Sequence, residues 1–460
     1  MLMSLVTGLL ATAIGWWPSL LNVGAALVRD TFINSWDAYT KYAWGWIIVN
    51  SLMIMNVTTR LSDARKIHML EGLLSAHYRS TSGVFPDMGS SSLRDYIYLS
   101  KAIDLADRIP YASVHLSTRQ DLPSHADAGA SSTAEAATVQ LEIKYMSNIT
   151  GEEEYWRKGV GGFLLWYAYL MFVCQTCGTC HVRERKANFI DLEYLVKQYL
   201  QTSGQEPDYR EMCDEALAGI QKHLGISGCL SPNMDHLVCF LPGSTALGAT
   251  EGLTEQEAHA LPTWNSEKDQ QMQLARELTK TCWAMYADLK PFPGSSARHS
   301  GSSKNDKTTW KDDITIKPLD AHNLQRTETV ESLFIMYRVT NDPIYRKWGW
   351  EVFKAFKKYT IVRDGEGFTS LQDMTKVLPP KRDDMERFWQ VISPILLMTS
   401  CLGADLHLDA GRDIHISILL LFSPREFLPI SELAFNTEAH VLPQFNQTNI
   451  RTGWERMKRP

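Results

Sequence analysis

The sequence has no excess of basic residues. Its 46 Lys and Arg residues are outnumbered by 52 Asp and Glu residues, so the formal net charge is −6 at pH 7. Proteins that bind nucleic acid usually carry a basic patch, and this balance gives no reason to expect a nucleic-acid partner. The alternating pattern of apolar and polar residues that marks β-strands is also scarce, which disfavours a fold built mainly from sheets.

Cysteines are too few for a disulfide-rich scaffold, because there are only eight in 460 residues. Four metal-ligating residues do cluster, as Cys174, Cys177, Cys180 and His181. Such a cluster by itself is typical of part of a zinc or iron–sulfur site. No second Cys-x-x-Cys follows, and the nearest further thiol is Cys213. The set is therefore incomplete, and it supports only the alternative of a membrane-associated structural protein with a Cys-rich metal site.

Residues 5–28 carry no charged side chain, and a stretch of this length could span a bilayer. No basic residue precedes it, although a secretory signal usually begins with one. We expect residues 1–28 to be an N-terminal membrane anchor or an uncleaved signal, and the alternative is a buried helix. Glycosylation sequons at Asn56, Asn148 and Asn446 are compatible with a lumenal chain.

Three segments repeat one order of features: a helical stretch, a short polar turn, and a tyrosine that begins the next helix. They run from Tyr145 to Tyr155, from Tyr199 to Tyr209 and from Tyr337 to Tyr345. Helical hairpins of this kind are typical of stacked helix pairs. Their spacing is irregular, so we expect a closed toroid rather than a linear solenoid. By contrast, residues 290–312 are rich in Ser, Lys and Gly, which predicts an exposed loop.

A pair of acidic residues lies at the start of one predicted helix. Glu328 and Glu331 are three residues apart, which places both carboxylates on one side of a helix near its N-terminus. Arg326 precedes them by two residues. The group could hold a water or a sugar hydroxyl. The alternative is that the acids are simply favourable there, because they complement the helix dipole.

The stretch Arg326–Ser332, Arg-Thr-Glu-Thr-Val-Glu-Ser, resembles the Arg-Pro-Glu-Thr-Val-Glu-Ser motif of glycoside hydrolase family 47, the class I α-1,2-mannosidases. Five other stretches resemble the family in its order: 28–39, 132–142, 236–243, 278–283 and 435–440. The resemblance implies an all-α fold, an (αα)7 toroidal barrel of helical hairpins whose inner helix ends meet at a central pocket. It implies one domain over residues 29–450, followed by a tail at 451–460.

The same resemblance implies a monomeric, calcium-dependent, inverting α-1,2-mannosidase. Its substrate would be terminal α-1,2-linked mannose on high-mannose N-glycans, in the lumen of the endoplasmic reticulum or Golgi. Glu135 would be the acid and Glu328 the base of the hydrolysis. Glu135 could alternatively complete a capping box with Ser132.

Further site residues are implied only by the resemblance. The sugar pocket would be lined by Arg326, Glu331, His236, Phe388 and Glu438, and Thr437 would bind Ca²⁺ through oxygen, as that ion prefers. Taken without the resemblance, His236 would be a structural histidine, Phe388 a core residue and Thr437 a helix cap. Cys239 and Cys282 lie in matching motifs of a chain that we expect to be lumenal, so we predict a disulfide between them.

The sequence also departs from the family pattern. Phe189 occupies the position of a catalytic Asp, Thr327 replaces the motif's Pro, and His68 replaces an Arg. Carboxylates expected within 290–295 and just after Phe388 are missing. Residues 159–190 and 390–416 resemble nothing in the family, so we expect the barrel to be distorted there. Activity could be impaired, and the alternative is an inactive, lectin-like mannose-binding relative in glycoprotein quality control.

Overall fold

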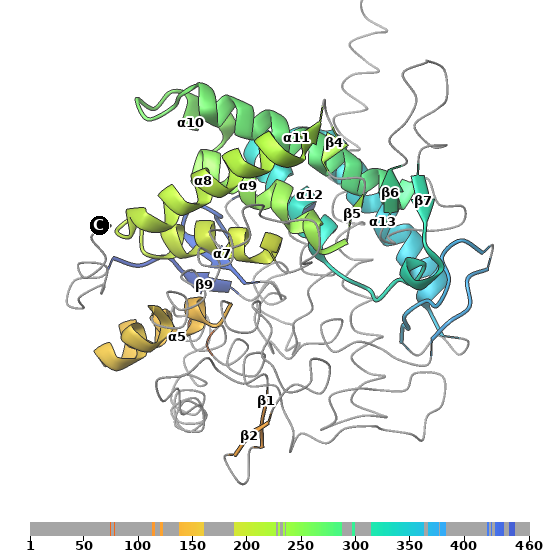
Figure 1. Ribbon diagram of the computed structural model, residues 1–460, viewed down its shortest axis with the longest axis horizontal. Helices are drawn as coiled ribbons and strands as arrows, with labels where there is room; N and C mark the ends of the chain where they lie inside the picture. The colour runs from red at the N-terminus through yellow and green to blue at the C-terminus, as the bar shows by residue number, and fades with distance from the viewer. Residues whose placement is uncertain are drawn as a thin grey trace, which may run out of the picture.

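The computed structural model describes about half of the chain. The described residues are 74, 78, 113–115, 120–122, 138–160, 188–226, 229–230, 233–234, 236–287, 297–299, 314–362, 367–376, 378–382, 421–422, 425, 428–436 and 441–446. Helices dominate this part, and the strands are short (Figure 1). No helix within these ranges is long and apolar enough to cross a membrane. Residues 5–28 and the cluster at 174–181 lie outside them.

The helices are α5 (Gln140–Thr150), α7 (Asn188–Gln201), α8 (Pro207–Leu224), α9 (Leu241–Thr250), α10 (Glu255–His259), α11 (Ser266–Ala287), α12 (Glu328–Thr340) and α13 (Pro343–Thr360), with the 3₁₀ turns η3 (His236–Phe240) and η5 (Pro318–Asp320). Four small antiparallel sheets accompany them. They pair β1 (Ser113–His115) with β2 (Gln120–Leu122), β3 (Gly225–Ile226) with β4 (Cys229–Leu230), β5 (Asn233–Met234) with β6 (Ala297–His299) and β7 (Ile314–Ile316), and β8 (Leu433–Phe435) with β9 (Val441–Pro443).

All three predicted hairpins are confirmed. Helix α5 ends at Gly151, whose φ of 73° is the left-handed conformation that glycine adopts without strain, and residues 153–160 form the next helix. A short turn joins α7 to α8 in the same way. Between α12 and α13, Asn341 is left-handed and the Asp342 side chain accepts a hydrogen bond from the Ile344 amide. At each of these turns, the turn residues and the helical periodicity of the sequence therefore predicted the observed hairpin.

The core is centred on α9, which packs against α7, α11 and α12 (Figure 1). All ten residues of α9 are buried and none is charged. A helix that carries no charge on any side belongs inside a protein rather than at its surface. Gly243 allows α12 to come close, because a Cβ there would lie 2.9 Å from the Ser332 hydroxyl. That hydroxyl accepts a hydrogen bond from the Gly243 amide and donates one to the Cys239 carbonyl.

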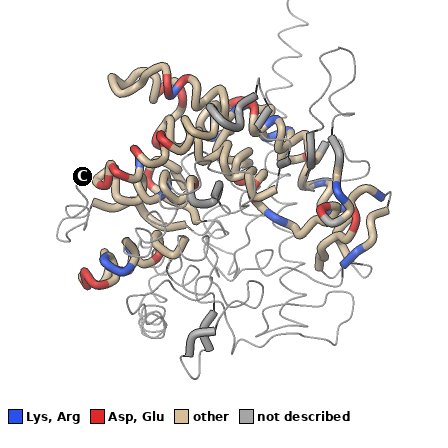
Figure 2. Tube along the Cα trace, in the orientation of Figure 1, with Lys and Arg blue, Asp and Glu red and all other residues tan. Residues whose placement is uncertain are grey.

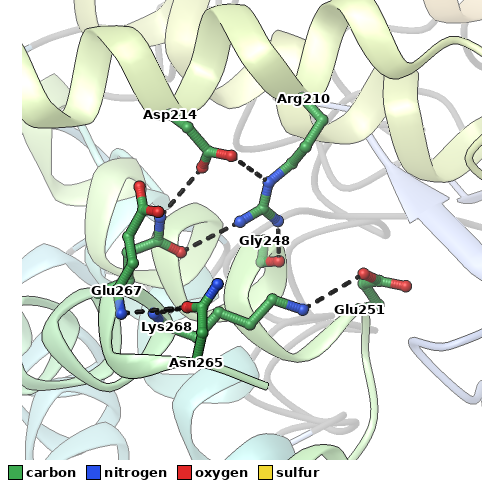
Figure 3. Close-up of polar contacts among 8 residues, drawn as sticks. Arg210, Asp214, Gly248, Glu251, Asn265, Glu267 and Lys268 are labelled. Atoms are coloured by element: carbon green, nitrogen blue, oxygen red, sulfur yellow. Dashed lines mark hydrogen bonds and ion pairs between the residues drawn. The ribbon is translucent and has the colours of Figure 1, made fainter. Parts of the chain in front are cut away.

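Helix α8 is tied to this core by a polar network around Arg210 (Figure 3). Its guanidinium donates to Asp214, at 2.8 Å from Nε to Oδ2, and to the carbonyl of Gly248 near the end of α9. Gln271 of α11 bonds both Arg210 and Asp214, while Lys268 reaches Glu251 at 3.6 Å. The network satisfies a carbonyl that the end of α9 leaves without a helical partner. Elsewhere, acidic and basic residues are interspersed along the helices (Figure 2).

One prediction about an irregular segment needs correction. Residues 297–299 are not loop but form β6, between β5 and β7, with His299 paired to Ile314. Their own composition did not signal a strand, because strand formation depends on neighbouring strands more than on local propensity. The segment 159–190, where we expect the barrel to be distorted, begins inside the helix at 153–160 and ends inside α7. Residues 161–187 and 390–416 lie outside the described part.

Candidate active site

Helix α12 begins at Glu328 and presents Glu331 one turn later, and both side chains are buried. Thr327 precedes them as N-cap, but its hydroxyl makes no capping bond. Instead its carbonyl accepts from the amides of Val330 and Glu331, at 2.9 and 3.0 Å. The helix therefore starts where the sequence predicted, although without the cap that a Thr could supply. Burying two acids so close together is costly unless each has a partner.

Glu328 has a partner in His236, from the turn η3. Nδ1 of His236 lies 2.8 Å from Oε2 of Glu328, although the two atoms are not aligned as a linear hydrogen bond. On its other side, Nε2 of His236 contacts the hydroxyl of Tyr286 in α11. Burial raises the pKa of Tyr286, and the charge of Glu328 raises it further. The half-buried Arg326 is close enough for its charge to act on the same hydroxyl in the opposite direction.

Glu331 has a different partner, Lys197 of α7. The Lys197 ammonium lies 2.9 Å from Oε1 of Glu331 and also contacts Oε1 of Glu193, four residues earlier in α7. Burial raises the pKa of Glu193 to about 7, and the nearby charges of Glu331 and Glu328 raise it too, while Lys197 opposes them. Burial raises the pKa of Glu331 as well. The ammonium of Lys197 thus contacts the carboxylates of both Glu193 and Glu331, at the junction of α7 and α12.

These acids retain unused acceptor atoms. Oε2 of Glu193 and Oε2 of Glu331 are buried, and neither has a hydrogen-bond partner in the part of the chain that the structure describes. Buried carboxylate oxygens are normally satisfied, so an unpaired one suggests a position for water or a ligand. Because sugar hydroxyls donate hydrogen bonds, a carbohydrate would suit this position.

A disulfide between Cys239 and Cys282 supports the same region, as predicted. Their Cα atoms are 5.8 Å apart. Cys239 belongs to η3, three residues after His236, and Cys282 lies in α11 one turn before Tyr286. The disulfide therefore joins the two elements whose side chains meet as His236 and Tyr286.

Comparison with known proteins places this arrangement in a family. The model of glycosyl hydrolase family 47 matches residues 64–391, which is most of the chain. The chain belongs to glycosyl hydrolase family 47. It is 36% identical to a mannosyl-oligosaccharide 1,2-alpha-mannosidase of Candida albicans, over 93% of this chain and 85% of that protein. It is 31% identical to the endoplasmic reticulum mannosyl-oligosaccharide 1,2-alpha-mannosidase of Saccharomyces cerevisiae, over 94% of each.

The solved structure of an alpha-1,2-mannosidase from Trichoderma reesei has the same fold as this family 47 chain. The TM-score is 0.68 at 18% sequence identity, over 92% of this chain and 99% of that one. The predicted all-α (αα)7 barrel is confirmed by this match, and the scarcity of strand in the described part agrees with it.

The structure brings together some of the predicted site residues of this family 47 chain. His236, Glu328 and Glu331 meet, and Arg326 lies beside them. Glu135, Phe388, Thr437 and Glu438 lie outside the described residues, so their roles stay predictions. Asn436, the residue before Thr437, is buried, and its amide donates to Oε1 of Glu142 at 3.1 Å. Among the described residues, no group of three His, Cys, Asp or Glu side chains could hold a metal ion.

Three residues of the site were not predicted from the sequence: Glu193, Lys197 and Tyr286. A weak signal existed for two of them, since Glu193 and Lys197 are four apart in an otherwise apolar stretch of α7. Charged residues are rarely buried unless they are paired, so an ion pair on the apolar face of a helix indicates a functional role. Nothing local distinguishes Tyr286, because its partner His236 is 50 residues away in the sequence.

Proposed function

We propose that this chain is a mannosyl-oligosaccharide α-1,2-mannosidase that removes terminal α-1,2-linked mannose from high-mannose N-glycans. The observation that carries the proposal is the group of three buried glutamates at the junction of α7 and α12, each of which keeps a buried oxygen without a hydrogen-bond partner in the described part of the chain. The names of the Candida and Saccharomyces relatives supply the linkage and the sugar.

The geometry suits Glu328 to the role of general base. Its Oε2 is held against His236, which leaves the other oxygen to accept a proton from an attacking water. Glu331 and Glu193 would accept hydrogen bonds from sugar hydroxyls and so orient the ring. The resemblance in sequence assigns the acid to Glu135. Inversion at the anomeric carbon requires that acid and base stand far enough apart to admit the water.

Calcium is part of this proposal, with Thr437 as its protein ligand. The neighbouring Asn436 is buried and its amide donates to Glu142, which fixes the chain just before Thr437. A hydroxyl and a carbonyl oxygen are the kind of ligand that Ca²⁺ prefers. The hydroxyl and carbonyl of Thr437 would hold the ion. When bound, it would supply a fixed positive charge that orients the sugar hydroxyls.

The secretory pathway is the proposed location. Relatives from yeasts and mammals are named as endoplasmic reticulum enzymes. The buried disulfide supports an oxidising compartment, where such bonds persist. We propose that residues 5–28 anchor the chain in the membrane and that it acts as a monomer.

The test measures release of free mannose from the disaccharide Man-α-1,2-Man, with Man-α-1,3-Man as the control for linkage. We expect β-mannose as the first product by NMR, loss of activity in Glu328→Gln, and loss of activity when a chelator removes calcium. Binding of the disaccharide without any release would instead support the lectin-like alternative. Neither binding nor release would contradict both.

A further inference from the structure

Tyr286 contacts the imidazole of His236 at the ring nitrogen that does not face Glu328. Its hydroxyl meets Nε2, with the two rings 5.5 Å apart and tilted by 60°. The other nitrogen, Nδ1, lies 2.8 Å from Oε2 of Glu328. Phenol, imidazole and carboxylate therefore form a row contributed by α11, η3 and α12, and the row is buried throughout.

The direction of the hydrogens in this row follows from the two contacts. Burial, and then the charge of Glu328, raise the pKa of Tyr286, so the phenol keeps its proton and can donate it. A neutral imidazole has one N–H and one lone pair, so an Nε2 that accepts from the phenol leaves the hydrogen on Nδ1. An N–H that faces a carboxylate oxygen is attractive, whereas a lone pair there would be repelled. Both contacts favour the same tautomer.

We propose that Tyr286 is a positioning residue that fixes His236 as the neutral tautomer protonated at Nδ1, and that it thereby holds Glu328 in place as the base. The tautomer is a property of the folded chain alone. Only the claim that Tyr286 holds Glu328 in place as the base rests on the proposed function.

The consequence for the reaction is that Oε2 of Glu328 faces Nδ1 of His236 at 2.8 Å, without an aligned hydrogen bond, and the other oxygen serves the water. Without the phenol hydroxyl, only the Nδ1 contact with Glu328 would favour this tautomer, and because that contact is not aligned as a hydrogen bond, part of the population would carry the hydrogen on Nε2. Nδ1 would then face Glu328 with a lone pair, and the carboxylate would rotate away from its working position. Small displacements of a catalytic group have large effects on rate.

The tautomer can be measured directly by ¹⁵N NMR of histidine-labelled protein at pH 7.5. The chain has 13 histidines, and the signal of His236 is assigned by its loss in His236→Asn. We expect the native chain to show a protonated Nδ1 and an unprotonated Nε2. Tyr286→Phe should shift the population toward protonated Nε2. A native imidazolium, a native Nε2–H tautomer, or no change in Tyr286→Phe would overturn the proposal. If Tyr286→Phe does not fold, the native spectrum decides.

Catalysis is tested separately with the same variant. We expect kcat for Man-α-1,2-Man to fall about tenfold with little change in KM, the scale of one lost hydrogen bond to an ionised system. The matched control is Tyr345→Phe, another buried tyrosine, which packs against Trp348 in α13 and should keep its activity. Absence of mannose release by the native chain would refute the proposed function but leave the tautomer testable. Unchanged kcat in an active Tyr286→Phe would refute the positioning role.

Discussion

The side chain of Lys197 places a single positive charge between two buried acids. Burial lowers the pKa of Lys197, but the charges of Glu193 and Glu331 outweigh that effect and raise it overall. The lysine therefore stays charged, while Glu193, with its pKa raised to about 7, is the member of the group that takes up a proton. The protonation state of this site should change within the physiological range of pH.

This shift predicts how stability depends on pH. An acid whose pKa rises on folding binds a proton in the folded chain at pH values where the unfolded chain has lost it, so stability falls as pH increases. For Glu193 the window runs from its ordinary value of 4.5 to about 7. We expect the melting temperature to fall across this window and Glu193→Gln, which mimics the protonated acid, to flatten the fall. The exposed control Glu153→Gln should keep the native slope, and an equal slope in Glu193→Gln would disprove the assignment.

Replacing the lysine should separate its role in the site from the general cost of losing a buried ion pair. Lys197→Met leaves two acids without their cation, and we expect the unfolding free energy to fall by about 3–5 kcal/mol. The chain offers a matched control in Lys144→Met, since Lys144 is equally buried and pairs with Glu206. Both variants should lose stability in urea denaturation. Only Lys197→Met should weaken binding of mannose disaccharide by calorimetry, and equal weakening in both would contradict a local role.

Position 189 gives a further prediction, because the resemblance to the family implies an Asp there, one turn before Glu193 in α7. We expect Phe189→Asp to raise the rate of mannose release by about ten- to a hundredfold, the scale of one restored positioning group. Phe189→Asn has nearly the same size without the charge, and it should restore much less. A rate unchanged by Phe189→Asp would mean that other residues limit turnover.

Sequence reasoning found the residues of the site that lie in motifs, and it missed those defined by contact. Glu328, Glu331 and His236 were predicted because the resemblance covers their stretches. Lys197 was missed because its bond to Glu331 spans 134 residues, and no local pattern records such a pairing. The same holds for Tyr286. Long-range polar contacts are a property of the packed barrel rather than of any one segment.

At the scale of elements, the approach of α9 to α12 depends on a residue without a side chain. A methyl group at Gly243 would lie 2.9 Å from Oγ and 3.0 Å from Cα of Ser332, which is closer than packed atoms normally come. The Ser332 hydroxyl also holds the amide of Gly243 and the carbonyl of Cys239. The start of α12 therefore cannot move away without breaking both hydrogen bonds.

Gly243→Ala should accordingly destabilise the protein by about 1–3 kcal/mol, as overpacking usually does. Gly219→Ala in α8 is the matched control, because a Cβ at that position meets nothing within 4 Å. There we expect a gain of about 0.5–1 kcal/mol, since Ala favours a helix over Gly. Thermal denaturation of both variants measures the difference. A neutral Gly243→Ala would show that the two helices can separate without cost.

Helical elements were more predictable than strands. The three hairpins were found because capping and turn residues such as Gly151, Asn341 and Asp342 act locally, within a few residues. Strand β6 was missed because its three residues become a strand only when β5 and β7 lie on either side.

For the whole molecule, the disulfide is the one covalent link seen between elements of the described core. It joins η3 to α11 across 43 positions of sequence. We expect Cys239→Ala/Cys282→Ala to lower the unfolding free energy by about 4 kcal/mol, from the extra freedom of the unfolded chain. Urea denaturation measures it, and Cys213→Ala, which removes a buried thiol outside any disulfide, is the control. If reductant lowers the stability of the double variant as much as that of the native chain, the effect has another source.

The overall architecture was predictable because irregular hairpin spacing and ordered motifs pointed to the same toroid. What could not be predicted was how the closed ring brings α7, α11 and α12 to one point. That convergence creates the pairs of Lys197 with Glu331 and of His236 with Tyr286.

Helix α9 has a consequence for how the protein is made. Its ten residues are covered by helices from both directions along the chain, and α12 is synthesised later than α9. At ribosomal speeds of about 5–20 residues per second, the new α9 waits on the order of ten seconds before α12 is complete. During that interval the face of this uncharged helix that α12 will cover has no partner. We expect chaperones to bind this segment of the nascent chain until α12 covers it.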